Sequence, residues 1–395
     1  MSYFFSDRIG GLKPSAIREI LKSTSDPSVI SFAAGNPAPE AFPVEDVRRI
    51  TDEILTETPI LALQYSITEG YPALRTALSE MLSKRYNIGN EADDTLVVSG
   101  AQQAVDLAVR SLVNDGDTVI SENPSFVASL NCFRSYRANV VGVPMQSDGI
   151  DTEKLEAALK ANPNTRLIYV IPNFQNPSGI TMSLEKRHAV YELAKKHGAL
   201  ILEDNPYGDL RFRGEHIPSI KSFDTENIVI YCGSFSKILS PGLRVGFVNA
   251  HKDILAKMTV AKQCNDVHTT ILSQLICYKF ITECDLDAHI KKLQSIYRGK
   301  CELMIKHIDE CFSPKITHTS PDGGLFIWCT LPDGSDMMKF CATAAAHKVA
   351  VVPGSAFTTT EGEPTNSFRL NFSTPTDDNI IKGCKLLGAL TKEMF

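Results

Sequence analysis

One segment carries side chains that could attach a phosphorylated carbonyl compound. Residues 227–232 form an apolar run that predicts a buried strand, and Ser234, Ser236 and Lys237 follow it directly. After a Ser-Pro-Gly turn, Arg244 opens a second apolar run. A lysine amine can form a Schiff base with an aldehyde, while hydroxyls and a guanidinium suit a phosphate. The segment therefore favours a covalent lysine site.

The second of these two strands is expected to run antiparallel to the first. Parallel strands need a connection of about a dozen residues or more, usually with a helix, and residues 233–243 leave little room for one. An antiparallel return places Arg244 at the same sheet edge as Lys237. A lysine in a Ser/Gly turn is, by itself, more often a solvated loop residue, so the rest of the chain must decide.

Composition and charge limit the classes of protein to consider. The chain has 395 residues, 43% hydrophobic and 22% charged, which predicts a globular protein of two or three domains. Its net charge of -6 gives no reason to expect nucleic acid or a membrane as a partner. The ten cysteines lack metal-binding spacing, so we expect reduced thiols and no metal site. No apolar run is long enough to span a membrane, and we expect a cytoplasmic protein.

Apolar runs and helically spaced segments alternate from residue 95 to residue 249. This pattern is typical of a doubly wound α/β domain with a largely parallel sheet. The expected strands lie at 95–98, 117–121, 166–171, 199–203, 227–232 and 244–249. Residues 122–126 are expected to form a turn. Ser183 and Gly198 are the expected caps of one of the intervening helices.

The flanking parts of the chain have a different pattern. Helical spacing predicts helices at 15–22, 44–57 and 71–85 and through most of 254–308, with apolar strands at 324–330, 349–352 and 368–372. We therefore expect a large domain at 45–301 and a smaller α+β domain at 302–395. An N-terminal arm, residues 1–44, would complete the smaller domain.

Polar side chains follow four of the expected strands at the point where each strand ends. They are Ser99 to Gln102, Asn173 with Asn176, Asp204 with Tyr207, and Ser234 to Lys237. Ligands of open α/β sheets bind outside these carboxyl ends, so one ligand could contact all four groups. Each group alone also fits an ordinary turn or helix cap.

Together, the four groups match the chemistry of pyridoxal 5′-phosphate (PLP). A helix start at Gly100 offers backbone N–H groups to a phosphate. Asp204 ends a buried strand, where an unpaired carboxylate is costly, and a protonated pyridine nitrogen would pair with it. That protonated ring acts as an electron sink. Phe126 could cover the ring, although it could also be an ordinary core residue, and Lys237 would take the aldehyde.

Over essentially its full length, the chain resembles the class I/II aminotransferases, which are fold-type I PLP-dependent enzymes. Among these it is most similar to the 2-aminoadipate and kynurenine aminotransferase branch. The matching segments are 15–20, 32–39, 64–66, 99–104, 175–179, 203–207, 234–237, 242–246 and 367–369. Most of these segments are weak signals individually, and their order makes the resemblance specific.

The resemblance implies a role for each site residue. Lys237 would be the Schiff-base lysine and proton shuttle, and Asp204 would pair with the ring nitrogen. Further cofactor contacts would come from Gly100, Ala101, Gln102, Phe126, Asn176, Tyr207, Ser234, Ser236 and Arg244, and from Tyr65 of the second subunit of a homodimer. Arg369 would hold the substrate α-carboxylate through a bidentate contact. Asn176, Gly35 and Arg18 would also contact the substrate.

Two positions depart from the family pattern. Phe126 stands where relatives often have tyrosine, so ring stacking is kept but a hydroxyl is lost. Ala34 stands where close relatives often have glycine, which changes the fit near the substrate.

Three functions remain open at this level. The first is transfer of an amino group between an amino acid and a 2-oxo acid, with 2-oxoglutarate and glutamate as one pair. The second is another PLP reaction, catalysed by a β-lyase, decarboxylase or racemase, because the same groups stabilise a carbanion whichever bond breaks. The third is a PLP-binding sensor. Similar sensor domains follow an N-terminal DNA-binding domain, for which we expect no room before Phe32.

Overall fold

The computed structural model describes residues 3–10, 12, 26 and 28–395. The helix expected at 15–22, and with it Arg18, lies outside the described residues. The largest element is an eight-stranded sheet with the order β2-β9-β8-β7-β6-β3-β4-β5. Its strands are β2 (Asp93–Val98), β3 (Thr118–Asn123), β4 (Asn139–Gln146), β5 (Gly149–Ile150), β6 (Thr165–Val170), β7 (Leu200–Asp204), β8 (Val229–Ser234) and β9 (Gly246–His251).

β9 runs antiparallel to both of its neighbours, β2 and β8, which confirms the prediction from the short connection. Strands β8, β7, β6, β3 and β4 are mutually parallel. Between β8 and β9 the chain forms a 3₁₀ turn, η4 (Pro241–Leu243), instead of an α-helix. β9 begins two residues later than expected because Arg244 has left-handed backbone geometry, with φ of 54°.

Two further details of the sheet differ from the expectation. β3 continues to Asn123, so Glu122 and Asn123 are strand residues and not part of a turn. They stay in the strand because they pair in register with Val143 and Pro144 of β4. Neither β4, nor the two-residue β5 that pairs antiparallel with it at the sheet edge, was predicted.

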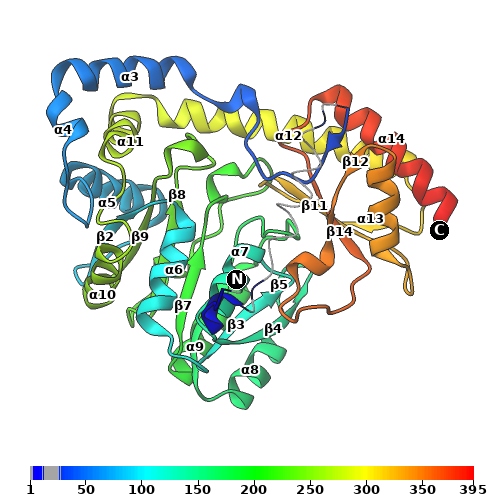
Figure 1. The fold of residues 1–395 in the computed structure, drawn as a ribbon, viewed down its shortest axis with the longest axis horizontal. Helices are drawn as coiled ribbons and strands as arrows, with labels where there is room; N and C mark the ends of the chain where they lie inside the picture. Colours follow the sequence, from blue (N-terminus) through cyan, green and yellow to red (C-terminus); the bar gives the residue numbers. More distant parts are fainter. Residues whose placement is uncertain (1–2, 11, 13–25, 27) are drawn as a thin grey trace.

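Helices cover both faces of this sheet, as expected for a doubly wound domain (Figure 1). Adjacent strand residues point to opposite faces, and Leu167 and Ile168 accordingly belong to different hydrophobic clusters. One cluster includes α6 (Ala101–Leu112) and α7 (Val127–Ser135), and the other includes α8 (Thr152–Ala161) and α9 (Leu184–His197). Ser183 and Gly198 cap α9 as predicted.

Two of the remaining helices, α3 (Val44–Glu57) and α5 (Pro72–Tyr86), match their expected positions closely. Their neighbours are α1 (Asp7–Gly10), α4 (Pro59–Leu63), α10 (Lys252–Gln263), α11 (Ile271–Glu283) and α12 (Leu286–Cys311). Short 3₁₀ turns are η1 (Pro39–Ala41), η2 (Gly208–Leu210) and η3 (Ile220–Phe223). Among the described residues, no helix is both long enough and apolar enough to cross a lipid bilayer.

The C-terminal part contains a second, antiparallel sheet of order β10-β11-β14-β13. Its elements are β10 (Thr317–His318), β11 (Phe326–Thr330), α13 (Met337–Ala346), β12 (Val349–Ala350), β13 (Val352–Pro353), η5 (Gly354–Phe357), β14 (Ser367–Asn371) and α14 (Asp377–Met394). The strand expected at 349–352 is divided, because β12 pairs instead with β1 (Ile30–Ser31) of the arm. The long α12 crosses residue 301, so the division into 45–301 and 302–395 with 1–44 stays a prediction.

Candidate active site

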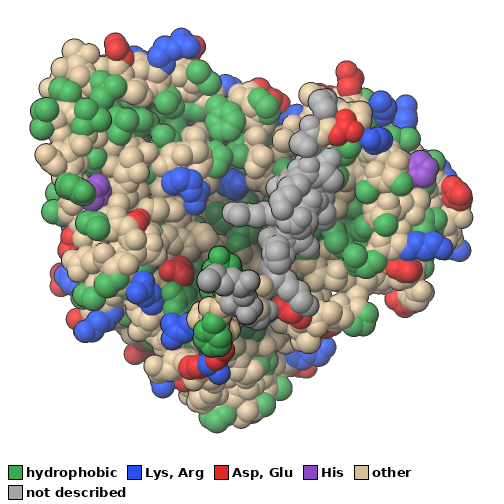
Figure 2. All heavy atoms as spheres, in the orientation of Figure 1, with side chains coloured by type: hydrophobic (Ala, Val, Ile, Leu, Met, Phe, Trp, Pro, Cys, Tyr) green, Lys and Arg blue, Asp and Glu red, His purple; other side chains and the backbone are tan. Residues whose placement is uncertain are grey.

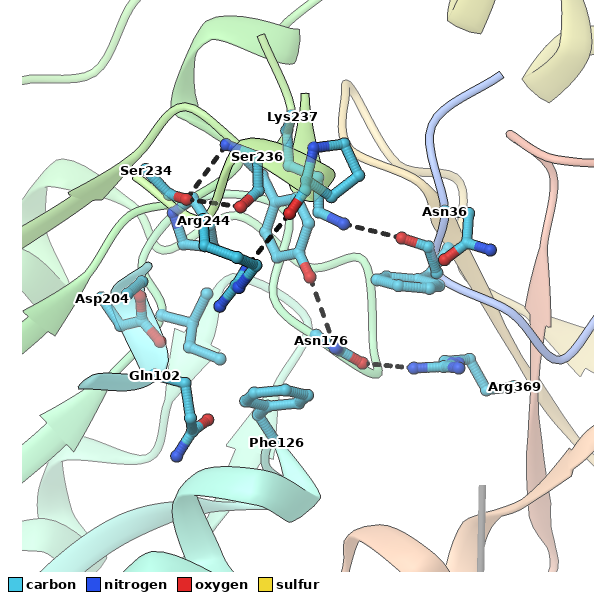
Figure 3. Close-up of a pocket in the computed structure, with 17 residues that line it drawn as sticks. Asn36, Gln102, Phe126, Asn176, Asp204, Ser234, Ser236, Lys237, Arg244 and Arg369 are labelled. Atoms are coloured by element: carbon cyan, nitrogen blue, oxygen red, sulfur yellow. Dashed lines mark hydrogen bonds between the residues drawn. The ribbon is translucent and has the colours of Figure 1, made fainter. Parts of the chain in front are cut away.

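A cavity opens where three parallel strands end, at Ile171 after β6, Asp204 of β7 and Ser234 of β8 (Figure 3). The residues of the expected site that line it are Gly35, Ala101, Gln102, Phe126, Asn176, Asp204, Tyr207, Ser234, Ser236, Lys237, Arg244 and Arg369. They come from the arm, from the ends of strands in the large sheet with the loops and the helix α6 that follow them, and from β14. The segments that the strand-end argument expected to meet therefore do line one cavity.

Lys237 extends from the loop after β8 into this cavity (Figure 3). Its Nζ donates a 2.7 Å hydrogen bond to the backbone carbonyl of Gly35. Burial, reinforced by the positive charges of Arg369 and Arg244, lowers the pKa of Lys237 from 10.5 to about 8. More of its amine is therefore neutral and nucleophilic at neutral pH than in a solvated lysine.

Asp204 ends β7 and is almost completely buried. Its Oδ2 accepts a 2.7 Å hydrogen bond from the hydroxyl of Tyr169, whereas its Oδ1 has no hydrogen-bond partner among the described residues. Burial raises the pKa of Asp204 to about 6, although the Tyr169 hydrogen bond opposes this rise. A buried polar atom without a partner is costly, so Oδ1 marks the place where a ligand would present a cationic or N–H group.

A cluster of donors lies where α6 meets the loop before β9. Gly100 has φ of +84° before α6, and a Cβ there would lie 2.3 Å from Nη2 of Arg244. Glycine therefore lets the guanidinium reach the helix start, where Nη2 donates to the Ser99 carbonyl at 3.2 Å. The hydroxyls of Ser234 and Ser236 are joined by a 2.9 Å hydrogen bond. A helix N-terminus, a guanidinium and two hydroxyls make a site for a phosphate.

The buried Arg369 of β14 lies on the side of the cavity that the second sheet forms (Figure 3). Its Nη1 donates to Oδ1 of Asn176 and its Nη2 to the Ala33 carbonyl, both at 2.7 Å. Its Nε has no partner among the described residues, and its guanidinium lies 4.2 Å from the ring centroid of Phe326. Nδ2 of Asn176 reaches the Tyr207 hydroxyl at 3.4 Å. The Asn176 amide thus links the arginine to the tyrosine.

Three residues of the expected site are not in the cavity lining. Gly100 adjoins Arg244 without lining the cavity. Tyr65 lies in the loop after α4, where it is 82% exposed and meets His268 edge-on with ring centroids 5.8 Å apart. Arg18 lies outside the described residues.

Sequence reasoning missed Tyr169, which holds Asp204, and Phe326, which supports Arg369. A signal for Tyr169 was present, because Tyr169 is a polar-tipped residue within the apolar part of an expected strand. In the folded sheet, Tyr169 and Asp204 lie on the same face of the neighbouring strands β6 and β7. Phe326 was only part of an expected strand. Asn36, Ile171, Pro206 and Pro241 also line the cavity and were not predicted.

Comparison with known proteins agrees with this geometry. The family "Aminotransferase class I and II" matches residues 27–387. The aromatic-amino-acid aminotransferase 1 of Thermococcus litoralis is 40% identical over 99% of this chain and 94% of its own length. The 2-aminoadipate transaminase of Thermus thermophilus is 36% identical over 99% of this chain and 97% of its own.

A solved structure gives the same result in three dimensions. The Pyrococcus horikoshii kynurenine aminotransferase, solved in complex with PMP, superposes with a TM-score of 0.95 at 37% identity, covering 99% of this chain and 97% of that one. The cavity fits PLP, because the free Oδ1 of Asp204, the donors around Arg244 and the amine of Lys237 match the nitrogen, phosphate and aldehyde of that cofactor. The chain belongs to the class I and II aminotransferase family and is a PLP-dependent aminotransferase.

Proposed function

We propose that this enzyme moves an amino group between an amino acid and a 2-oxo acid in two alternating half-reactions, with 2-oxoglutarate and glutamate as one pair. The observation that carries the proposal is that one cavity contains the low-pKa amine of Lys237, the unpartnered oxygen of Asp204 and the buried guanidinium of Arg369. In this order, the three groups would serve as a base, as a counter-ion for a protonated ring and as a receptor for the substrate carboxylate.

Each residue has a separate task in this proposal. PLP, when bound, supplies an electron sink for the carbanion left after loss of the α-proton. Asp204 keeps the ring nitrogen protonated through its Oδ1. Lys237 would hold the aldehyde, and once the amine of the donor has displaced it, the freed amine of Lys237 would carry the proton between two carbons. Arg369 holds the substrate carboxylate, using Nε and the Nη2 that Ala33 engages here.

A screen of the twenty common amino acids against 2-oxoglutarate tests this function. We expect glutamate to form with at least one donor, and double-reciprocal plots at several acceptor concentrations to give parallel lines, as for alternating half-reactions. Release of ammonia or carbon dioxide without any 2-oxo acid would instead identify a β-lyase or a decarboxylase.

The low pKa of Lys237 leads to a first prediction, about attachment of PLP to the cofactor-free protein. Because only the neutral amine attacks an aldehyde, the attachment rate should rise with pH to a plateau, with a midpoint near pH 8. Arg369→Gln removes a nearby positive charge that helps to lower this pKa, so its midpoint should lie at higher pH. Stopped-flow absorbance measures both, and a parental midpoint near 10.5 would contradict the assignment.

The proposed assembly is a homodimer in which Tyr65 reaches the phosphate of the neighbouring subunit. Exposed apolar side chains cluster around α4 and the adjoining loops, in what we call the α4 patch: Ile60, Leu63, Tyr65, Ile67 and Val267. Figure 2 shows hydrophobic side chains gathered over this end of the molecule. Exposed apolar patches of this kind mark protein interaction sites. The α4 patch therefore supports the homodimer that the resemblance implies.

Subunit complementation gives a second prediction, for the position of Tyr65. Tagged heterodimers of a Lys237→Ala chain with a Tyr65→Ala chain should contain one site with parental Lys237 and parental Tyr65. They should therefore show about half of the parental rate. If Tyr65 served its own subunit, both sites would carry a defect and no parental site would form. Sedimentation of the parent as a fully active monomer would also refute the dimer.

A third prediction concerns Arg18, which the resemblance assigns to a distal carboxylate of the substrate. Arg18→Ala should raise KM for glutamate and 2-oxoglutarate by the equivalent of about 1.5–3 kcal/mol, the usual cost of losing a hydrogen bond to a charged group. Leucine and phenylalanine should be affected much less. Equal changes in both substrate classes would assign Arg18 to folding of the arm.

A further inference from the structure

Glu122 is a buried carboxyl group that the proposed chemistry does not use. It lies at the end of β3 with no exposed surface. Its Oε2 accepts hydrogen bonds from the Ile171 backbone N–H at 3.1 Å and from Nε2 of Gln175 at 3.2 Å. Its Oε1 has no partner among the described residues. Both of its donors belong to the loop after β6, the loop that carries Asn176.

Gln175 extends this contact to a second part of the cavity wall. Its Nε2 also donates to the Pro124 carbonyl at 2.8 Å, in the turn that leads to Phe126. Its Oε1 accepts from the backbone N–H of Ser178 at 2.9 Å and from the Ser178 hydroxyl at 2.7 Å. Glu122 and Gln175 therefore hold together the loop of Asn176 and the turn of Phe126, both of which line the cavity (Figure 3).

The position of Asn176 matters because its side-chain amide contacts both Arg369 and Tyr207. Its Oδ1 accepts from Arg369 at 2.7 Å, while its Nδ2 makes only a long contact, 3.4 Å, with the Tyr207 hydroxyl. That long contact leaves Nδ2 able to approach the ring oxygen of PLP. A small displacement of the loop would move both contacts, and displacements of about 1 Å can cost on the order of 10²-fold in rate.

We propose that Glu122 is a positioning residue which, acting through Gln175 and the Ile171 backbone, fixes Asn176 for its contacts with Arg369 and the cofactor ring. The inference rests on the proposed function of Asn176 in this site. Burial, together with the negative charge of Asp204, raises the pKa of Glu122 to about 8, so the group is mainly a neutral acid at pH 7. A glutamine should therefore replace it well, because it retains a neutral acceptor oxygen of the same reach.

A double-mutant cycle between Glu122→Ala and Asn176→Ala tests this relation. The readouts are the Kd for PLP, the absorbance of the bound cofactor as a function of pH, and KM for the amino donor. Alone, Glu122→Ala should raise KM about tenfold or more and shift the pH midpoint of the visible band upward, because the ring oxygen loses a well-placed donor. In the Asn176→Ala background it should add nothing to either quantity. Glu122→Gln should stay within about threefold of the parent.

Glu203 provides a matched control for the burial of a carboxyl group. It is fully buried in the neighbouring part of the sheet, but its partners are Ser219, Ile220 and Lys221, which do not line the cavity. Glu203→Ala should lower the melting temperature and combine additively with Asn176→Ala. Gln175→Leu is a second test if Glu122→Ala does not fold, because it removes the connecting amide and should reproduce the same non-additive pattern.

Each result decides the question. Additive effects of Glu122→Ala and Asn176→Ala, or a Glu122→Gln variant as impaired as Glu122→Ala, would overturn the positioning role while leaving the function of Asn176 intact. An Asn176→Ala variant with parental KM and parental absorbance would overturn both the positioning role and the proposed function of Asn176.

Discussion

Lys237→Ala is expected to lose at least about 10²–10⁴-fold in turnover, the usual cost of removing a positioned general base. The lysine is also the proposed covalent link, so the visible absorbance of the linked cofactor should disappear. The donors around Arg244 and the free Oδ1 of Asp204 remain in place, so the variant should still bind PLP weakly. Transaminase assays, absorbance and equilibrium dialysis measure these three properties.

The control for this variant is a lysine outside the cavity. Lys252 lies at the start of α10 and donates to the Glu91 carbonyl. Lys252→Ala should keep parental turnover and absorbance. Turnover of Lys237→Ala within about tenfold of the parent, in a protein with the parental melting temperature, would refute the assignment of Lys237.

Asp204→Asn should leave PLP bound but slow removal of the α-proton by about 10²–10³-fold, as when a preorganised electrostatic contact is removed. The amide keeps the size of the side chain and can still bond to Tyr169, but it gives the ring nitrogen no negative partner. Rapid-kinetic measurement with an α-deuterated donor identifies the affected step, because the isotope effect should increase when proton removal becomes limiting.

Asp224→Asn is the matched control for a buried aspartate. Asp224 pairs with Lys221 and accepts from the backbone N–H groups of Ile228 and Val229, none of which lines the cavity. Its substitution should lower stability without changing the deuterium isotope effect. If Asp204→Asn matched the parental rate of proton removal, Asp204 would be a structural residue only.

Much of the site could be predicted from the sequence, because polar residues directly after buried strands must lie at one edge of a parallel sheet. This argument placed Asn176, Asp204 and Lys237 together, and the lining of the cavity confirms that they meet. The short connection before Arg244 added the antiparallel strand, and the pairing of β8 with β9 confirms it. These inferences depend only on local patterns and chain connectivity.

Contacts between individual side chains of different elements could not be predicted in the same way. The bond from Tyr169 to Asp204 depends on the register of β6 with β7, and the bonds of Glu122 depend on where the loop after β6 folds back. Alternation shows which face a side chain occupies but not which neighbour it meets. Similarly, Phe326 is almost 300 residues from Gly35, and only the folded chain shows that a Cβ on Gly35 would come within 3.0 Å of the Phe326 ring.

The most direct test of the proposed function is a single half-reaction with the purified, PLP-loaded enzyme. When an active amino donor is added without any 2-oxo acid, we expect the visible absorbance to fall as the bound cofactor changes to its amine form, with one 2-oxo acid released per active site. Adding 2-oxoglutarate should restore the absorbance and release one glutamate. Continuous product formation from the donor alone, with the visible band retained, would contradict an aminotransferase that works by two half-reactions.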